Sequence, residues 1–178
     1  MRKTLTQIFI VLLAIVCTYV VVRYMKLDSV SFAWVLNFSL MIFALYFMET
    51  LTTPLTAAYY DPKKWERGGR IYELLGINAF RKLLVIIGWE NVIRKSNPLT
   101  KNTDALAHLY NQTKKNELSH LVICFIVLGF NIYVAVEYGM AKAWALLVLN
   151  LLLHVYPIFL QRYNRPRFQR ALALSRRR

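Results

Sequence analysis

Two histidines and one glutamate, His120, His154 and Glu117, are the candidates in this chain for proton transfer. Glu117 and His120 stand three residues apart, so they share one face if the segment is helical. Asn150 and His154 stand four residues apart and also share a face. Histidine titrates nearest neutral pH, which makes His120 and His154 candidate general bases. Solvated helix ends at Glu117 and His120, and a structural His–Asn hydrogen bond at His154, are the alternatives.

Metal chemistry has little support in the residue pattern. The Glu-x-x-His spacing occurs at di-iron sites in helical bundles, but those sites need a second copy. The sequence holds one copy, and it has no zinc-ligand spacing, no phosphate-binding glycine loop and no serine-centred elbow. We therefore expect no metal and no bound cofactor.

Four long apolar stretches must position these residues. They cover about 4–24, 30–52, 118–138 and 141–160. About 20 helical residues cross the roughly 30 Å hydrocarbon core of a bilayer. The chain is 57% hydrophobic, above the norm for soluble domains. The sequence predicts an all-α integral membrane protein with four transmembrane helices in a single membrane domain, residues 1–178.

Other residues inside these stretches are expected to be structural. Asn37 and Asn131 lie deep in their stretches and are interpreted as hydrogen-bonding partners between helices. Cys17 and Cys124 are interpreted as small core residues, without a disulfide or metal role.

The basic residues predict the orientation. The chain has 23 Lys and Arg, of which 20 lie in the N-terminus, the central loop 53–117 and the tail 161–178. The positive-inside rule therefore places both termini and the loop in the cytoplasm, and the protein in the cell membrane. Anionic lipid headgroups are the expected partners of this charge, and nucleic acid is not. The first stretch is interpreted as an uncleaved span, because no A-x-A-like cleavage site precedes Arg23.

The central loop contains a second pattern. Gly68 and Gly69 indicate a break or a close backbone approach. Apolar residues recur at helical spacing over 71–87, in a segment too charged to span a membrane. We expect it to be amphipathic and interfacial, anchored by Trp65 and Trp89. A simple connector, a lid over a lipid-facing site and a re-entrant hairpin remain open. Residues 91–116 are expected to form a loop and a short helix.

The tail begins with the compact element QRYNRPR. The guanidinium forks of Arg162, Arg165 and Arg167 suit phosphate and carboxylate groups. Asn164, before a short Arg-Pro turn, is expected to fix a sharp bend that directs Arg162 or Arg165 back toward the helix ends.

Three elements together resemble a known family. They are KKWERGGRIYELLGINAFRK (63–82), the Glu117-x-x-His120 entry to the third span, and LQRYNRPR (160–167). In this order around four spans they resemble the glycosyl-4,4'-diaponeurosporenoate acyltransferase family, over roughly Trp65 to Arg167. That family includes a membrane enzyme of carotenoid biosynthesis that adds a fatty acyl chain to the sugar of a glycosylated carotenoid. The resemblance implies acyl transfer to a hydroxyl of a lipid or glycolipid acceptor at the cytoplasmic face.

Acyl transfer to a hydroxyl needs a general base, and the residues offer candidates for it. His120 is the expected base, oriented by Glu117, with His154 as the alternative base. Acyl-CoA or another acyl donor is the expected co-substrate, and basic or aromatic groups would hold its anionic headgroup and the oxyanion. The substrate-binding candidates are Trp65, Arg67, Arg70, Tyr72, Glu73, Arg81, Arg162, Asn164, Arg165 and Arg167. A non-catalytic membrane scaffold or lipid-binding accessory subunit is the competing hypothesis. A small transporter is less well supported, because the sequence has no internal repeat.

Overall fold

The computed structural model describes residues 2–88 and 103–176, and every regular element among them is helical. Four of its helices are long and apolar enough to cross a membrane, which confirms the predicted all-helical fold with four helices of this kind. The chain divides into two compact units. Unit 1 contains Met1–Thr53 and Leu118–Pro157, and unit 2 contains Pro54–Glu117 and Ile158–Arg178.

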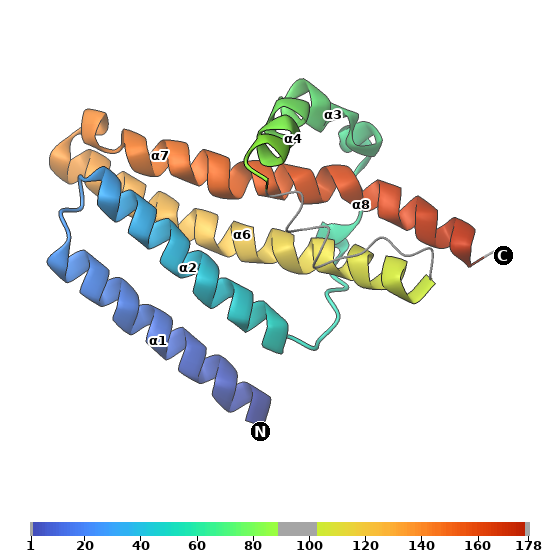
Figure 1. The fold of residues 1–178 in the computed structure, drawn as a ribbon, viewed down its shortest axis with the longest axis horizontal. Coiled ribbons are helices and arrows are strands. Elements are labelled where there is room, and N and C mark those ends of the chain that lie inside the picture. Colours follow the sequence, from blue (N-terminus) through green and yellow to red (C-terminus); the bar gives the residue numbers. More distant parts are fainter. Residues whose placement is uncertain (1, 89–102, 177–178) are drawn as a thin grey trace. The chain divides into compact units, whose positions relative to one another are not determined.

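Unit 1 is built on a helical hairpin. Helices α1 (Arg2–Tyr24) and α2 (Val30–Thr50) lie side by side (Figure 1). Ser29 begins α2 as its N-cap, since its hydroxyl accepts a hydrogen bond of 3.1 Å from the backbone N–H of Phe32. The unit is completed by the apolar part of α6 (Thr103–Tyr138), the short turn η3 (Met140–Lys142), helix α7 (Trp144–Asn150) and the π-helical turn η4 (Leu151–Val155).

The core of unit 1 lies mainly between α2, α6 and α7. Phe32, Ala33 and Leu36 of α2 are fully buried, and so are Val127 and Val134 of α6. Helix α1 contributes little to this core, and most of its apolar side chains remain exposed. In a chain of this composition such exposed apolar side chains are suited to contact lipid.

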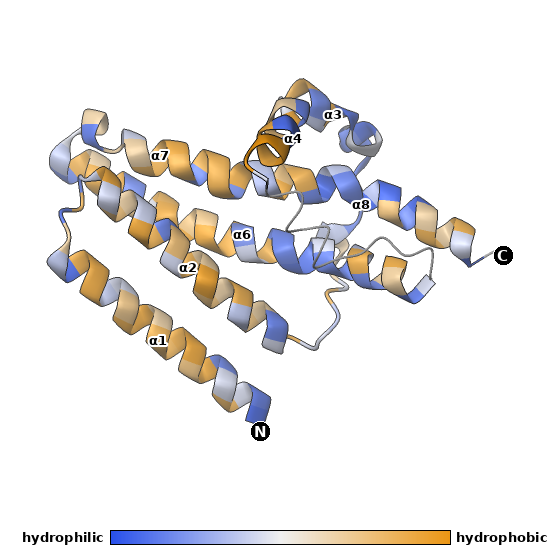
Figure 2. Ribbon diagram, in the orientation of Figure 1, coloured by the Kyte–Doolittle hydropathy of each residue, from blue (hydrophilic) through white to orange (hydrophobic). Residues whose placement is uncertain are grey.

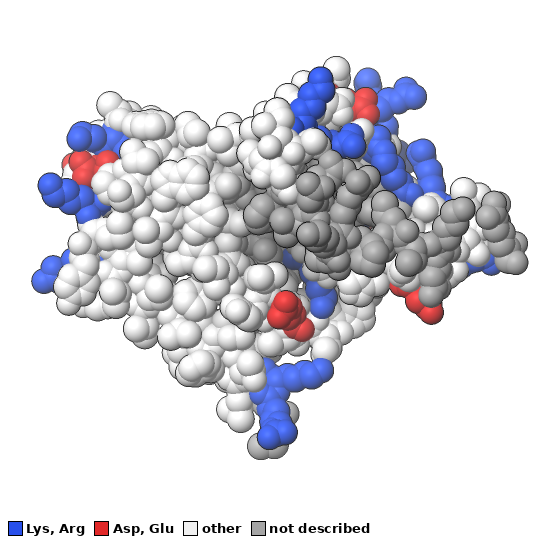
Figure 3. Space-filling model, in the orientation of Figure 1, with Lys and Arg blue, Asp and Glu red and all other residues white. Residues whose placement is uncertain are grey.

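The surface of the spans has the charge pattern expected inside a bilayer. Figure 2 shows apolar residues along α1, α2 and α7. Figure 3 shows an uncharged surface over α2 and α7, with Lys, Arg, Asp and Glu at its margins. Within unit 1, Asn131 donates a 2.8 Å hydrogen bond from its amide nitrogen to the carbonyl of Ala143, which confirms its predicted role between helices.

Unit 2 contains the shorter elements of the central loop. They are η1 (Ala58–Tyr60), η2 (Lys64–Gly69), α3 (Arg70–Leu74) and α4 (Ile77–Ile86), together with the polar part of α6 and most of α8 (Tyr156–Ser175). The segment predicted as one amphipathic stretch over 71–87 is two helices. Gly76 separates them with a left-handed φ of 83°, a conformation that glycine adopts without a steric penalty.

The predicted sharp bend at Asn164 is wrong, because the last helix continues through Asn164 and Pro166 to Ser175. The helix that contains the third predicted span begins at Thr103, within the segment 91–116 where a loop and a short helix were expected. These polar extensions are helical because their side chains bind one another inside unit 2, as described below. Trp89 and the first part of the segment 91–116, as far as residue 102, lie outside the described residues.

The core of unit 1 generates a stability prediction. Phe32 is fully buried and makes an edge-to-face contact with Phe130, with ring centroids 5.9 Å apart. Phe32→Ala should lower the free energy of unfolding by about 3 kcal/mol, because it leaves a cavity that lipid cannot fill. Unfolding of the purified protein from neutral detergent by added SDS measures this loss. Phe9→Ala, at a side chain that is 64% exposed on α1, is the matched control and should change little.

Candidate functional site

A chain of hydrogen bonds within unit 1 joins both candidate bases. His120 Nδ1 lies 3.2 Å from His154 Nδ1, and their ring centroids are 5.5 Å apart. His154 Nε2 lies 2.8 Å from the side-chain oxygen of Asn37. Asn37 in turn donates from its amide nitrogen to the backbone carbonyl of Ala33, at 2.6 Å. The three side chains come from α6, η4 and α2, so the fold of the spans brings them together.

The orientation of Asn37 determines which ring nitrogens of the two neutral histidines carry a hydrogen. Its amide nitrogen is bound to Ala33, so its oxygen must accept, and His154 Nε2 carries a hydrogen. His154 Nδ1 is then an acceptor, and His120 Nδ1 must donate to it. His120 Nε2 keeps its lone pair. This is the tautomer that a general base requires.

The backbone around His154 departs from a regular α-helix. His154 lies in the π-helical turn η4, and such turns are frequent at functional sites. Pro157 has no N–H to give to the carbonyl of Leu153, four residues earlier. The backbone of Leu153 instead forms a hydrogen bond with the His120 ring. The irregular turn therefore helps to fix His120.

Asn150 is placed differently from the sequence-based expectation. Its amide nitrogen donates to the carbonyl of Cys124 at 3.1 Å, so the amide partner of His154 is Asn37. The side-chain oxygen of Asn150 is buried and has no hydrogen-bond partner within the described residues. A buried acceptor without a partner requires an explanation, and a bound ligand hydroxyl is one.

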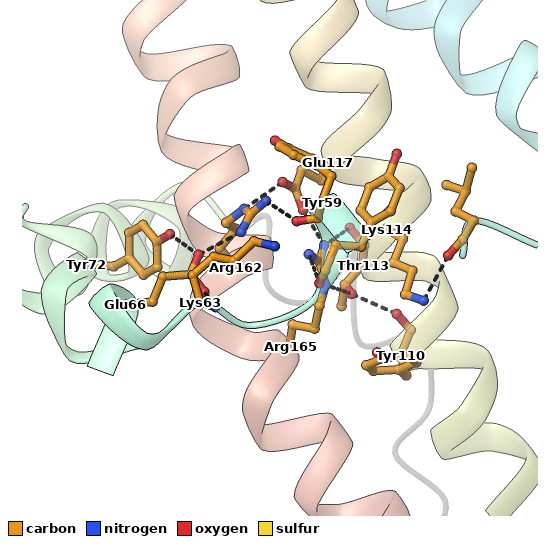
Figure 4. A network of polar contacts seen from close by, with 12 residues as sticks. Tyr59, Lys63, Glu66, Tyr72, Tyr110, Thr113, Lys114, Glu117, Arg162 and Arg165 are labelled. Carbon is orange, nitrogen blue, oxygen red and sulfur yellow. Dashed lines mark hydrogen bonds and ion pairs between the residues drawn. The ribbon is translucent and has the colours of Figure 1, made fainter. Parts of the chain in front are cut away.

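The second polar cluster lies within unit 2 and is ionic. Arg162 is 8% exposed and donates at 2.7 Å to a carboxylate oxygen of Glu117, at 2.7 Å to Glu66 and at 2.8 Å to the carbonyl of Tyr59 (Figure 4). Its guanidinium carbon also lies 4.5 Å from the centroid of the Tyr59 ring. All three nitrogens of the guanidinium group thus have protein partners.

Arg165 extends this cluster toward α6. It is 1% exposed, and it donates to the hydroxyl and the carbonyl of Thr113, at 3.1 Å and 3.2 Å, and to the carbonyl of Tyr60 at 3.1 Å. It also pairs with the second carboxylate oxygen of Glu117 (Figure 4). Glu117, predicted to orient His120, therefore has one arginine on each of its carboxylate oxygens.

Glu66 completes the cluster from η2. It accepts from the backbone N–H of Lys63 and from the phenol of Tyr72, each at 2.7 Å. Burial opposes ionisation, but these two hydrogen bonds and Arg162 outweigh it and lower the pKa of the Glu66 carboxyl. Burial, with the hydrogen bond to Glu66, raises the pKa of the Tyr72 phenol. Glu66 is thus an anion and Tyr72 a neutral donor.

Two arginines and two glutamates balance each other in this buried cluster, which we call the Arg–Glu cluster (Arg162, Arg165, Glu66 and Glu117). Its arginines were predicted to bind substrate, and Glu66 was not among the candidates. The available signal was composition, since buried arginines need carboxylate partners and this chain has only nine acidic residues to supply them.

The remaining substrate-binding candidates lie on the surface of unit 2. Arg67 and Arg70 are exposed. Arg81 and Arg167 approach the ring of Tyr163, with their guanidinium carbons 5.7 Å and 3.6 Å from its centroid.

The other three candidates, Glu73, Trp65 and Asn164, differ in their contacts and exposure. Glu73 accepts a 3.1 Å hydrogen bond from the phenol of Tyr163. Trp65 is 59% exposed, with its ring centroid 6.4 Å from that of Tyr72. Asn164 is half-buried in α8. Within the described residues, no three His, Cys, Asp or Glu side chains lie close enough to hold a metal ion.

The Arg–Glu cluster predicts a large difference between two glutamates. Glu117→Gln removes the charge that both buried arginines share, so it should lower the free energy of unfolding by about 3–5 kcal/mol. Glu73→Gln is the matched control, since the side chain of Glu73 is 39% exposed and its pair with Arg167 measures 3.5 Å. Surface pairs contribute about 0–1 kcal/mol. Thermal unfolding in detergent, followed by circular dichroism, compares the two, and equal stability of the variants would contradict the structural role of Glu117.

Comparison with known proteins gives one match. The family model described as glycosyl-4,4'-diaponeurosporenoate acyltransferase matches residues 56–174, which is more than half of the chain. No curated protein and no solved structure matches the chain. The matched residues include all three elements on which the resemblance was based, from the central loop to the last helix. The chain therefore belongs to the glycosyl-4,4'-diaponeurosporenoate acyltransferase family.

Proposed function

We propose that the protein is a membrane acyltransferase that moves a fatty acyl chain onto a hydroxyl of a lipid or glycolipid acceptor, of the carotenoid-glycoside kind. Family membership supports acyl transfer, and the four apolar helices support a multi-pass membrane protein. The distribution of Lys and Arg supports a cytoplasmic site, with both termini in the cytoplasm. The observation that carries the catalytic assignment is the hydrogen-bonded chain of His120, His154 and Asn37.

In the proposed reaction, His120 acts as the general base. Its Nε2 takes the proton of the acceptor hydroxyl while the hydroxyl oxygen attacks the carbonyl carbon of the donor. The new carbon–oxygen bond completes an ester, the bond to the leaving group breaks, and the proton passes from His120 to the leaving group. For an acyl-CoA donor, the broken bond is carbon–sulfur and the product is the free thiol.

His154 and Asn37 are proposed as positioning residues. Both ring nitrogens of His154 have protein partners and its side chain is fully buried, so it is poorly placed to meet a substrate. His120 is only partly buried. His154 holds the proton of His120 on Nδ1, as a carboxylate does in a serine-hydrolase triad, but without a charge.

The position of Asn150 favours an acceptor site in the same part of unit 1 as His154. Its buried oxygen has no partner within the described residues, and it precedes His154 by four residues. An acceptor hydroxyl that donates to this oxygen would satisfy it. We assign binding of the donor's anionic group to exposed cations of unit 2.

The assignment of the base predicts the behaviour of two variants. His120→Ala should lower acyl transfer by roughly a hundredfold or more, because the hydroxyl loses its proton acceptor. His108→Ala is the matched control, since His108 is exposed on α6 and lies outside the hydrogen-bonded chain. Mass spectrometry of membrane lipids from cells expressing each protein measures the product, which is heavier than the acceptor by one acyl chain.

Membrane insertion of each variant is the control in this experiment. Full product from a well-inserted His120→Ala protein would remove the assignment. If the wild type yields no new species in a host that contains a glycolipid acceptor, the non-catalytic scaffold hypothesis is favoured.

Asn37 predicts a partial effect. Asn37→Leu removes the acceptor for His154 Nε2, so His120 should lose its fixed tautomer in part of the molecules. We expect kcat to fall roughly ten- to a hundredfold while KM changes less than twofold. Asn37→Asp keeps an oxygen for His154 but loses the donor to the Ala33 carbonyl and adds a charge, so it should recover only part of kcat. Steady-state kinetics on purified protein measure both variants, and a rise in KM at constant kcat would assign Asn37 to substrate binding instead.

A further inference from the structure

A short stretch of left-handed backbone lies at the end of η2, within unit 2. Arg67, Gly68 and Gly69 have φ angles of 49°, 66° and 98°. Residues with side chains rarely adopt this region, and a run of three is unusual even where glycine permits it. The run turns the chain from η2 into α3.

The two glycines let this backbone approach α8 closely. A methyl group on Gly69 would lie 3.2 Å from the carbonyl oxygen of Tyr163 and 3.3 Å from Arg167 Nη1. A methyl group on Gly68 would lie 3.3 Å from Arg170 Nη2. Two guanidinium groups of α8 therefore lie directly over the glycine backbone.

One of these guanidinium groups is held in place before any ligand binds. Arg167 stacks on the ring of Tyr163 and donates to the Tyr163 carbonyl. The phenol of Tyr163 donates to Glu73, so the ring that supports Arg167 is itself fixed. A preorganised arginine loses less conformational entropy when it binds an anion.

Among the described residues, the cations around the glycines outnumber the carboxylates that contact them. Arg67, Arg70, Arg167 and Arg170 are all exposed, and the carboxylate that contacts one of them is Glu73, at 3.5 Å from Arg167. In the Arg–Glu cluster of the same unit, by contrast, two arginines are matched by two glutamates. Exposed cations in excess over a nearby carboxylate favour an anionic ligand with more than one negative charge.

We propose that Arg67, Arg70, Arg167 and Arg170, arranged around Gly68 and Gly69, form a binding site for a phosphate group. Planar guanidinium forks match the oxygens of phosphate, and the exposed Gly68 presents backbone without a Cβ atom, whereas Gly69 is buried against α8. The ligand is a phosphate ester, borne either by a soluble donor such as acyl-CoA or by a phospholipid headgroup. Its identification as the acyl donor rests on the proposed function, whereas phosphate binding does not.

Binding of coenzyme A and of phosphatidylglycerol tests the site without any acyl transfer. Coenzyme A is titrated by calorimetry into the full-length protein in neutral detergent, and retained phosphatidylglycerol is counted by native mass spectrometry. The test variant is Arg167→Gln with Arg170→Gln. The control is Arg23→Gln with Lys26→Gln, which removes two exposed cations from unit 1.

We expect the test variant to bind its ligand at least tenfold more weakly and the control to change less than twofold. Loss of coenzyme A alone identifies a soluble donor, and loss of phosphatidylglycerol alone identifies a lipid headgroup. Unchanged binding of both, or an equal loss in the control, overturns the proposal.

A second variant keeps every charge in place. Gly68→Ala should weaken binding of the same ligand severalfold, because a side chain is strained at a φ of 66° and its methyl group would lie 3.3 Å from Arg170 Nη2, which must then shift. It tests the site even if the double variant fails to fold, and full binding by a folded Gly68→Ala protein contradicts the role of the glycine. Since each readout is binding, an inactive His120→Ala protein should bind normally, so this proposal and the assigned base can fail separately.

Discussion

Two buried arginines constrain unit 2 more than any other interaction in it, because a guanidinium group cannot leave water without partners. Arg162 and Arg165 together contact both carboxylates of the Arg–Glu cluster and backbone carbonyls on η1 and α6. Removing one member of such a set leaves an uncompensated charge in a region of low dielectric. Lysine could not replace either residue, since a single ammonium group cannot reach acceptors that lie on several sides of it.

The same helix carries arginines of two kinds. Arg162 and Arg165 are three residues apart and share the buried face of α8, whereas Arg167 and Arg170, also three apart, are exposed. The buried pair fixes the rotation of the helix about its axis, and that rotation determines where the exposed pair is presented. The structural role of the buried pair and the proposed binding role of the exposed pair thus both depend on the rotation of α8.

In unit 1 the polar groups must orient one another without a permanent charge, since they lie within helices suited to a bilayer. Its hydrogen-bonded chain consists of a neutral amide and two imidazole rings, which can orient one another without a permanent charge. A carboxylate in place of Asn37 would orient His154 equally well, but a charge within a span is unfavourable by about 3 kcal/mol on insertion scales. The choice of asparagine is consistent with that difference.

Much of this architecture could be predicted from the sequence, because hydropathy over twenty residues is a strong local signal. The four long apolar helices follow from it, and a polar residue inside such a stretch, Asn131, was predicted to form the hydrogen bond that it makes. The helical extension through Pro166 could not be predicted, since it depends on ion pairs to residues about 50 and 100 positions away. The partnership of His154 with Asn37, 117 positions apart, likewise depends on tertiary packing that no local pattern encodes.

Those long separations also impose an order on synthesis. The hairpin of α1 and α2 can pack as soon as residue 50 has left the ribosome, because its contacts are local. Glu66 and Glu117 must wait for Arg162, which follows them by 96 and 45 residues. The ion pairs of unit 2 can therefore form only after nearly the whole chain has been synthesised, whereas the contacts between α1 and α2 need only its first 50 residues.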